Sequence, residues 1–407
     1  MKSLLRKPEW SGTGEDAAER ASGVWAKAAP QPLAPARWDW LRVRRVLVVR
    51  LRSIGDTVLA TPSLLALRRF LPQAQIDILL EEWVAPVLDG CAEVDNVLTI
   101  ERGSRVARAR MARTLRANDY DVAYNLHGGT TATLLMRAAG ARHRVGYADY
   151  QYSRLLNHAA PPAPALWAQE KTHSVEQQLA LLGWTGVPVS DRPPTRLAVT
   201  ERAAASVNQR LTARGLNEAT PFALLHTAAA FASKEWAAEN FARVAESLAA
   251  NGLQLVALAA PNQGSVLDAL QAESSARIHA FTDFSLPEVT ALAARARIFV
   301  GNDSGIAHIA AAVRTPSVVV FGSSNVAHWR PWTTAPAEVV REEMPCAPCP
   351  GYTCAEFDEP ECIRRVSTGR VVAAIERVLK ASNEQSGVSS QQSTVSRQLD
   401  SAEQTVL

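Results

Sequence analysis

The chain has 407 residues, a length that favours two domains over one. Hydrophobic residues make up 47% of the sequence and charged residues 20%, a composition that excludes collagen-like and wholly disordered proteins. The net charge of +3 is too small to indicate nucleic acid as the main partner.

No segment approaches the ~20 consecutive apolar residues of a membrane-spanning helix, and the N-terminus lacks the apolar core of a signal peptide. We therefore expect a cytoplasmic protein. Residues 1–42 show no sustained helical or strand period of apolar residues and are predicted to form an N-terminal extension. Its tryptophans are expected to pack on the fold rather than on a membrane surface.

Short apolar runs then alternate with stretches of helical spacing, in two series. Strands are predicted at 46–51, 76–80, 97–100 and 122–126, and then at 222–225, 255–259, 298–300 and 317–321. Helices are predicted at 62–71, 105–117, 131–139 and 172–182, and then at 237–250, 287–296 and 305–313. Two such series predict an α/β protein with two Rossmann-like, doubly wound domains, whose ligands bind at the carboxyl ends of the strands.

The predicted domains are an N-terminal one at 43–187 and a C-terminal one at 197–380, joined by a Pro-rich linker at 188–196. Residues 381–407 hold seven Ser and five Gln but hardly any large apolar side chain. Such a composition cannot bury enough apolar surface to fold, so we predict a disordered tail there.

Two polar segments follow predicted strands and begin helices. In the first, Gly55 permits close approach of another chain segment, and Asp56 stands at the helix start. On position alone, capping the helix is the commoner use of such an aspartate, and catalysis is the alternative.

The second segment contains Asp303, Ser304, Gly305 and His308. Ser304 and Gly305 would offer backbone N–H groups at a helix N-terminus, which suits a phosphate. His308 lies within the first helical turn and can reach the same ligand. Asp303 would bind sugar hydroxyls or orient a neighbouring donor. The alternative is a capped helix with a core histidine.

Lys234 and Trp236 lie in the loop after the strand at 222–225. A lysine there can neutralise a phosphate, although an ordinary solvated lysine is the alternative. Together, the patterns Ser53-x-Gly-Asp56-x5-Pro62, Lys234-x-Trp236 and Asp303-Ser-Gly-x-x-His308 resemble glycosyltransferase family 9, the lipopolysaccharide heptosyltransferases. The resemblance covers about residues 43–380.

This resemblance implies a GT-B fold with the acceptor on the N-terminal domain and the nucleotide sugar, ADP-heptose in this family, on the C-terminal one. Asp56 would be the general base of an inverting transfer to a lipopolysaccharide inner-core acceptor, with Ser53 and Gly55 on the acceptor side. The donor would be bound by Thr227, Lys234, Gln263, Asp303, Ser304, Gly305 and His308. Because such fixed groups stabilise a charged diphosphate leaving group, transfer would require no cofactor.

The chain departs from the family pattern at Ala229, Ala230 and Gln263, where members often carry hydroxyl residues and a glutamate. These positions would touch the donor, so a donor other than ADP-heptose stays open. Two further functions also stay open: a GT-B sugar-nucleotide epimerase or hydrolase, and a non-catalytic carbohydrate-binding GT-B protein. The intact motifs argue against the last, since a scaffold has no need to keep them.

Residues 101–116 contain six Arg and one Glu. A helix would gather most of these arginines on one face: Arg102, Arg105, Arg108, Arg113 and Arg116. Such a face is usually only solvated, but the implied acceptor is a phosphorylated lipid A-core glycolipid at the inner face of the inner membrane. Binding of the acceptor by Arg105 and Arg108, and peripheral contact with the membrane, are therefore the functional alternatives.

Four cysteines lie within 17 positions, in the segment 346–362: Cys346, Cys349, Cys354 and Cys362. They would suit a structural zinc ion or an iron–sulfur cluster, although the spacing matches no standard zinc finger. Reduced thiols in a Pro-rich loop are the alternative. Asp119 and Asp121 look like a metal-binding carboxylate pair, but they precede a strand and are predicted to lie in a surface turn.

Overall fold

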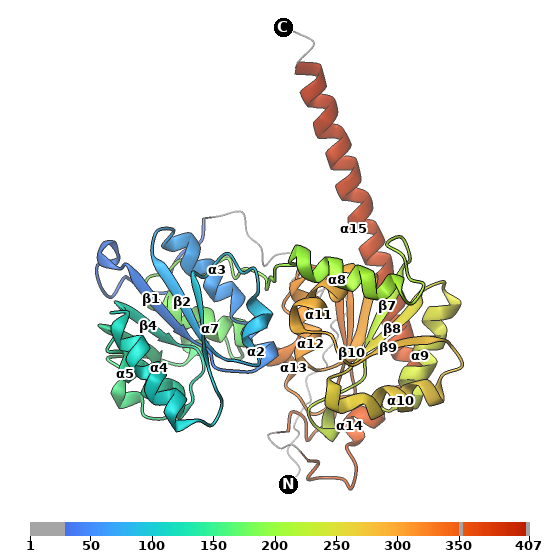
Figure 1. The fold of residues 1–407 in the computed structure, drawn as a ribbon, viewed down its shortest axis with the longest axis horizontal. Coiled ribbons are helices and arrows are strands. Elements are labelled where there is room, and N and C mark those ends of the chain that lie inside the picture. The colour runs from blue at the N-terminus through green and yellow to red at the C-terminus, as the bar shows by residue number, and fades with distance from the viewer. Residues whose placement is uncertain (1–28, 350–352, 404–407) are drawn as a thin grey trace, which may run out of the picture.

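The structure is a computed structural model that describes residues 29–349 and 353–403. It consists of two α/β halves side by side, each built around one six-stranded parallel sheet (Figure 1). The two doubly wound domains predicted from the sequence are therefore present. None of the helices in the described part of the chain is long and apolar enough to span a bilayer.

The first sheet has the strand order β3-β2-β1-β4-β5-β6. Its strands are β1 (Arg45–Val49), β2 (Gln75–Glu81), β3 (Asn96–Ile100), β4 (Val122–Asn125), β5 (His143–Tyr147) and β6 (His158–Ala160). Its helices are α2 (Ile54–Val58), α3 (Thr61–Phe70), α4 (Arg105–Ala117), α5 (Thr130–Ala139), α6 (Ala163–Trp167) and α7 (Ser174–Gly183). The central strands are buried along almost their whole length, because helices cover both faces of the sheet.

The second sheet has the order β12-β11-β10-β7-β8-β9. Its strands are β7 (Phe222–His226), β8 (Gln254–Leu258), β9 (Ile278–Phe281), β10 (Ile298–Asn302), β11 (Ser317–Phe321) and β12 (Ala337–Arg341). Its helices are α8 (Glu201–Thr212), α9 (Ala238–Ala250), α10 (Gly264–Glu273), α11 (Leu286–Arg295), α12 (Gly305–Ala312), α13 (Val326–Trp329), α14 (Glu361–Arg364) and α15 (Thr368–Glu403).

In both sheets the chain order reverses in the middle, between β1 and β4 and between β10 and β7. A ligand of a doubly wound sheet binds outside the carboxyl ends of the strands at such a reversal. The chain leaves β1 toward Asp56 and leaves β10 toward Asp303. The fold thus places both segments singled out in the sequence where ligands are expected.

Two regions at the ends of the chain bear on the sequence predictions. Trp38 stacks on His143, with ring centroids 4.3 Å apart, and Nε1 of Trp40 donates to the carbonyl oxygen of Thr185 at 3.0 Å. These two tryptophans therefore pack on the fold, as predicted, whereas the rest of the extension, residues 1–28, lies outside the described residues.

At the other end, the structure differs from the predicted disordered tail, because residues 381–403 continue α15. The start of α15 packs in the core of the second half through Val371, Ala374 and Val378. Further along, the helix points away from the domain (Figure 1). Once a packed segment has nucleated a helix, each added residue costs little, and no proline interrupts the sequence here.

Candidate active site

Asp56 is the third residue of α2, the helix that follows β1. Its Oδ2 atom accepts hydrogen bonds from the backbone N and from Oγ of Ser53, both at 3.1 Å. Its Oδ1 atom pairs with the guanidinium of Arg50. The capping role that position alone favours is therefore present. The carboxylate can still meet a substrate, because 21% of the Asp56 side chain is exposed.

Arg50 belongs to this site and was not predicted from the sequence. Its side chain is 9% exposed and donates to the carbonyl oxygens of Leu126, at 2.7 Å, and of Asp56, at 3.4 Å. Together with the ion pair, these contacts hold the Asp56 carboxylate in one orientation. A charged residue at the carboxyl end of a buried strand is the sequence signal that could have found it.

Lys234 and Ser324 both donate to Asp303, at the carboxyl end of β10. Nζ of Lys234 lies 2.8 Å and Oγ of Ser324 lies 2.5 Å from Oδ2 of Asp303. The Asp303 side chain is 7% exposed and that of Lys234 is 24% exposed. Asp303 thus orients Lys234, whose side chain stays partly exposed.

Thr227 and Ser304 lie at the same edge of the second sheet. Oγ1 of Thr227 is buried and has no hydrogen-bond partner among the described residues. Oγ of Ser304 lies 3.3 Å from Nδ1 of His226. Gln263 follows β8, two strands away from β10, and in the described part of the chain no hydrogen bond joins its side chain to the others.

The two halves of the molecule touch where α2 meets α12. A Cβ atom added to Gly55 would lie 2.7 Å from Cδ2 of His308, and one added to Gly305 would lie 2.8 Å from Cβ of Ile54. Both glycines are therefore needed for close approach of two helices. The predicted acceptor-side and donor-side segments lie directly against each other.

His308 is buried in this contact, and its Nδ1 atom has no hydrogen-bond partner in the part of the chain that the structure describes. Burial lowers the pKa of His308, and the carboxylates of Asp303 and Asp56 oppose this effect. Both carboxylates therefore act on the same imidazole, that of His308.

Two cavities at the carboxyl end of the first sheet share His127, and Asp56 itself lines neither of them. One, of about 210 Å³, lies between the two halves and is lined by Arg50 and Tyr150 on one side and by His328 of α13 on the other. Burial and the nearby Arg50 guanidinium lower the pKa of His127 to about 4, so its imidazole is neutral at pH 7. His127 was also missed, although it lies only two residues after the end of β4.

The other cavity, of about 440 Å³, is lined by more arginines than carboxylates. Arg52, Arg102 and Arg108 line it, together with Glu81 and Glu101. Of the two α4 arginines predicted to bind the acceptor, Arg108 is thus in the cavity wall. Arg105 is exposed on the same helix and does not line the cavity.

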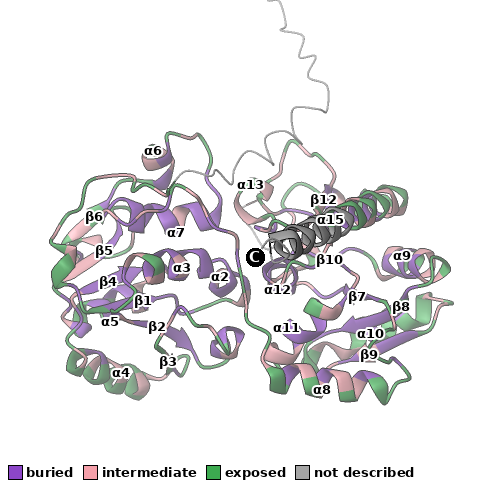
Figure 2. Ribbon diagram, turned by 90° about the horizontal axis from the view of Figure 1, so that it is seen from above, coloured by how far each residue is buried: buried purple, intermediate pink, exposed green. Residues whose placement is uncertain are grey.

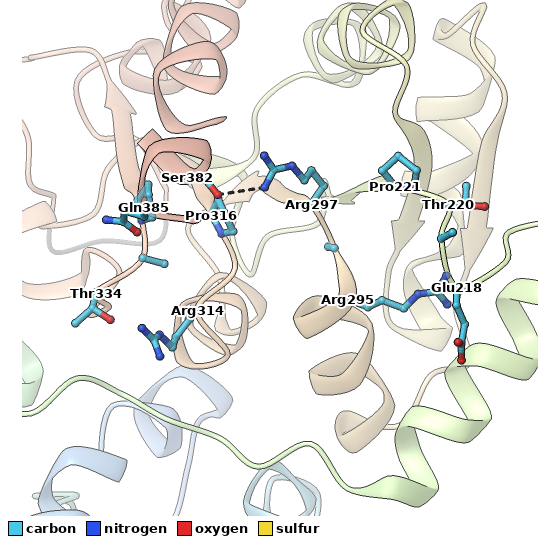
Figure 3. A pocket seen from close by; sticks show the side chains of 14 residues that line it. Glu218, Thr220, Pro221, Arg295, Arg297, Arg314, Pro316, Thr334, Ser382 and Gln385 are labelled. Atoms are coloured by element: carbon cyan, nitrogen blue, oxygen red, sulfur yellow. Dashed lines mark hydrogen bonds between the residues drawn. The ribbon is translucent and has the colours of Figure 1, made fainter. Parts of the chain in front are cut away.

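A further pocket lies at the opposite edge of the second sheet (Figure 3). It has a volume of about 640 Å³ and is lined by Arg295, Arg297 and Arg314, and the Arg297 guanidinium donates to Ser382 of α15 at 3.2 Å. Arg297 precedes β10, whereas Asp303 follows it. This pocket is therefore separate from the candidate active site.

The cysteine cluster does not form a metal site in this structure. Sγ of Cys349 donates to the carbonyl oxygen of Cys346 at 3.3 Å, and Cys362 is buried on α14. Burial, followed by the neighbouring cysteines, raises the pKa of both Cys349 and Cys362. Among the described residues no three His, Cys, Asp or Glu side chains are grouped to hold an ion, so the predicted zinc or iron–sulfur site is not supported.

Asp119 and Asp121, the carboxylate pair that looked like a metal site in the sequence, have structural roles. Oδ2 of Asp121 accepts hydrogen bonds from the backbone N atoms of Arg44, at 2.8 Å, and Arg45, at 3.1 Å. Asp119 has a φ of 48° in the turn before β4. Both residues lie at the amino edge of the first sheet, as predicted.

Comparison with known proteins finds a matching family profile and related sequences. The sequence profile of glycosyltransferase family 9 (heptosyltransferase) matches residues 108–358. This range contains Lys234 and the segment from Asp303 to His308, and Asp56 precedes it. Lipopolysaccharide heptosyltransferase 3 of Escherichia coli K12 is 28% identical over 298 residues, which are 70% of this chain and 84% of that protein.

Solved structures share the fold. A family 9 glycosyltransferase of Veillonella parvula is 20% identical, with a TM-score of 0.74 over 85% of this chain and 99% of that one. The ADP-heptose heptosyltransferase II of E. coli is 23% identical, with a TM-score of 0.67 over 82% of this chain and 98% of that one. The E. coli heptosyltransferase WaaC with ADP is 20% identical, with a TM-score of 0.63 over 82% and 99%.

These structural likenesses confirm the predicted GT-B arrangement of two Rossmann-like domains. The profile match spans more than half of the chain and includes the donor-side motifs. The chain therefore belongs to glycosyltransferase family 9 and is a glycosyltransferase of that family.

Proposed function

We propose that the protein transfers heptose from ADP-heptose to a hydroxyl group of a lipopolysaccharide inner-core acceptor, on the cytoplasmic side of the membrane and with inversion at the anomeric carbon. The observation that carries the proposal is the contact of α2 with α12, which brings Asp56 and His308 to one site between the two halves. A transferase with one substrate on each domain needs such a meeting point. The names of the heptosyltransferase relatives support the choice of sugar and pathway.

In this reaction Asp56 takes the proton of the acceptor hydroxyl as its oxygen attacks the anomeric carbon. The bond from that carbon to the diphosphate oxygen breaks, and its electron pair leaves with the diphosphate. Lys234 and the backbone N–H groups at the start of α12 stabilise the negative charge that grows on the diphosphate. The step therefore needs no metal ion to supply positive charge. Arg50 acts as a positioning residue, since it holds the Asp56 carboxylate.

The acceptor is proposed to bind in the 440 Å³ cavity. Through His127 this cavity adjoins the interdomain cavity that contains Arg50, the partner of Asp56. Its three arginines outnumber its two glutamates, and one of these, Glu81, already accepts a hydrogen bond from Nε1 of Trp83 at 2.8 Å. An acceptor with a phosphate or carboxylate close to the reacting hydroxyl fits this charge.

We also propose residues 43–187 and 197–380 as the two domains, with 188–196 as the linker. The linker is anchored on the second half: Oγ1 of Thr195 donates to the carbonyl oxygen of Trp332 at 2.6 Å. Such an anchor limits how far the two halves can turn relative to each other. It supports a site that is assembled from both of them.

The test is transfer by the Asp56→Asn variant, with ADP-heptose and a purified inner-core acceptor. Asparagine can still cap α2 but cannot take a proton, so the transfer rate should fall by about 10²–10⁴-fold. Donor binding, followed as thermal stabilisation by ADP-heptose, should be unchanged. Unchanged turnover would contradict the proposed base. Release of heptose by the native enzyme without an acceptor would instead identify a hydrolase, and donor binding without any turnover would identify a binding protein.

A further inference from the structure

The outer surface of α4 and α5 is strongly basic. The exposed arginines of α4 are Arg105, Arg108, Arg110, Arg113 and Arg116. α5 adds the exposed Arg137, and neither helix contains Asp or Glu. Across the described ranges, no ion pair joins any of these guanidinium groups to a carboxylate. Within the described residues, no carboxylate therefore neutralises these guanidinium groups through an ion pair.

Apolar side chains lie among these arginines. Val106 of α4 is 69% exposed and Leu134 of α5 is 50% exposed. At about 100° per residue, Val106 falls between Arg113 and Arg110 on the outer side of α4. A shallow groove of about 720 Å³ between the two helices is lined by Arg113, Arg116, Leu134 and Arg137. Figure 2 shows α4 largely exposed, in contrast to the buried α7.

A basic surface with exposed apolar side chains fits one kind of partner well. Anionic lipid headgroups attract the arginines, and Val106 and Leu134 can enter the boundary between the headgroups and the acyl chains. A nucleic acid would use the charge but would leave the two apolar side chains without a role.

The basic face is continuous with the proposed acceptor cavity. Arg108 belongs to α4 and also lines that cavity. Arg102, three residues before the helix, lines the cavity too. A glycolipid anchored in a bilayer beneath α4 would therefore present its sugar to the cavity without leaving the membrane.

We propose that the face formed by α4 and α5 docks the protein on an anionic phospholipid bilayer, so that a membrane-embedded acceptor enters the 440 Å³ cavity. Docking itself does not depend on the reaction, and only the delivery of the acceptor rests on the proposed function. Each arginine near an anionic membrane surface raises the partition coefficient about fivefold. Removal of three arginines should therefore weaken membrane binding about 100-fold.

The experiment measures co-sedimentation of the full chain with phosphatidylcholine vesicles that contain or lack phosphatidylglycerol. The test variant is Arg110→Gln/Arg113→Gln/Arg116→Gln, which changes no residue of the acceptor cavity. The matched control is Arg202→Gln/Arg243→Gln/Arg277→Gln, which removes the same charge from exposed positions on the second half. The native protein and the control should bind only the vesicles with phosphatidylglycerol, and the test variant should lose this binding about 100-fold.

Equal binding by the two triple variants, or equal binding of the native protein to both kinds of vesicle, would overturn the docking surface. A second assay separates this outcome from a failure of the proposed function. With a deacylated, water-soluble acceptor the test variant should match the native rate, whereas with a full-length acceptor in vesicles it should be slower. If the native protein transfers sugar to neither acceptor, the proposed function fails while the vesicle result still stands.

Discussion

Gly55 of α2 and His308 of α12 are in contact across the two halves of the molecule, and a Cβ atom on Gly55 would lie 2.7 Å from Cδ2 of His308. Glycine is needed at this position for close approach rather than for a left-handed backbone. The contact fixes how near the Asp56 carboxylate lies to the donor segment. Substitutions at three positions and one pH dependence test this part of the molecule.

The first is Gly55→Ala, which adds a methyl group where there is no room. Overpacking of about 1–3 kcal/mol would push α2 away from α12, and the transfer rate should fall about tenfold or more. Steady-state kinetics measures this loss. Gly369→Ala is the control, because a Cβ atom there meets nothing within 4 Å. Equal activity of the two variants would show that the contact has no part in catalysis.

The second is Arg50→Gln, which removes the group that holds Asp56. A displaced base can cost about 100-fold in kcat, whereas KM for the donor should change little, because Arg50 lies on the first half. The free energy of unfolding should fall by about 3–5 kcal/mol, since the change leaves the Asp56 carboxylate without its buried partner.

Arg50→Lys separates position from charge. Lysine keeps the positive charge but lacks the forked guanidinium that reaches both Leu126 and Asp56, so kcat should recover only in part. Urea unfolding and kinetics of both variants check these values. A raised donor KM with unchanged kcat would contradict the positioning role.

The third is Lys234→Met, which removes the ammonium group beside Asp303. Loss of a preorganised charge at a leaving group should lower kcat by about 10²–10³-fold. It also leaves the buried Asp303 carboxylate without its cationic partner. The affinity for the donor should therefore fall as well, which calorimetry with ADP measures. Lys171→Met, at an exposed position, is the matched control. ADP binding equal to that of this control would contradict a donor-side role for Lys234.

The fourth concerns pH. Burial lowers the pKa of His226 from 6.5 to about 4. As the pH falls, the imidazole of His226 takes up a proton in the unfolded chain at a higher pH than in the folded chain. The contribution of neutral His226 to stability is therefore present above pH ~6.5 and is lost as the pH falls from there toward 4. The loss should reach about 3 kcal/mol for this group.

Urea unfolding of the native protein and of His226→Gln, followed over this pH range, checks the effect. The variant should lose less stability than the native protein as the pH falls. Between about pH 7 and pH 8 the two stability curves should run parallel, because His226 is neutral in both the folded and the unfolded state there. Parallel curves down to pH ~4 would contradict the lowered pKa.

Local patterns in the sequence predicted much of the fold. The helix predicted at 105–117 is α4, with the same bounds, and the strand predicted at 317–321 is β11. The strands that escaped prediction are β5, β6, β9 and β12, which lie at or next to the sheet edges. Edge strands are less buried, so their sequences lack the continuous apolar run that marks a central strand.

The sequence by itself determined the parallel α/β architecture, the family, and the segments that carry polar residues at strand ends, because each depends on residues close together in the chain. Only the tertiary structure decided which side chains meet. Lys234 pairs with Asp303, 69 positions away, and Gly55 meets His308 only because the two halves dock at α2 and α12. The same holds for the thiols, which are close together in the sequence but which, among the described residues, are not grouped to hold a metal ion. Strand order and domain docking set these contacts, and no short pattern contains either.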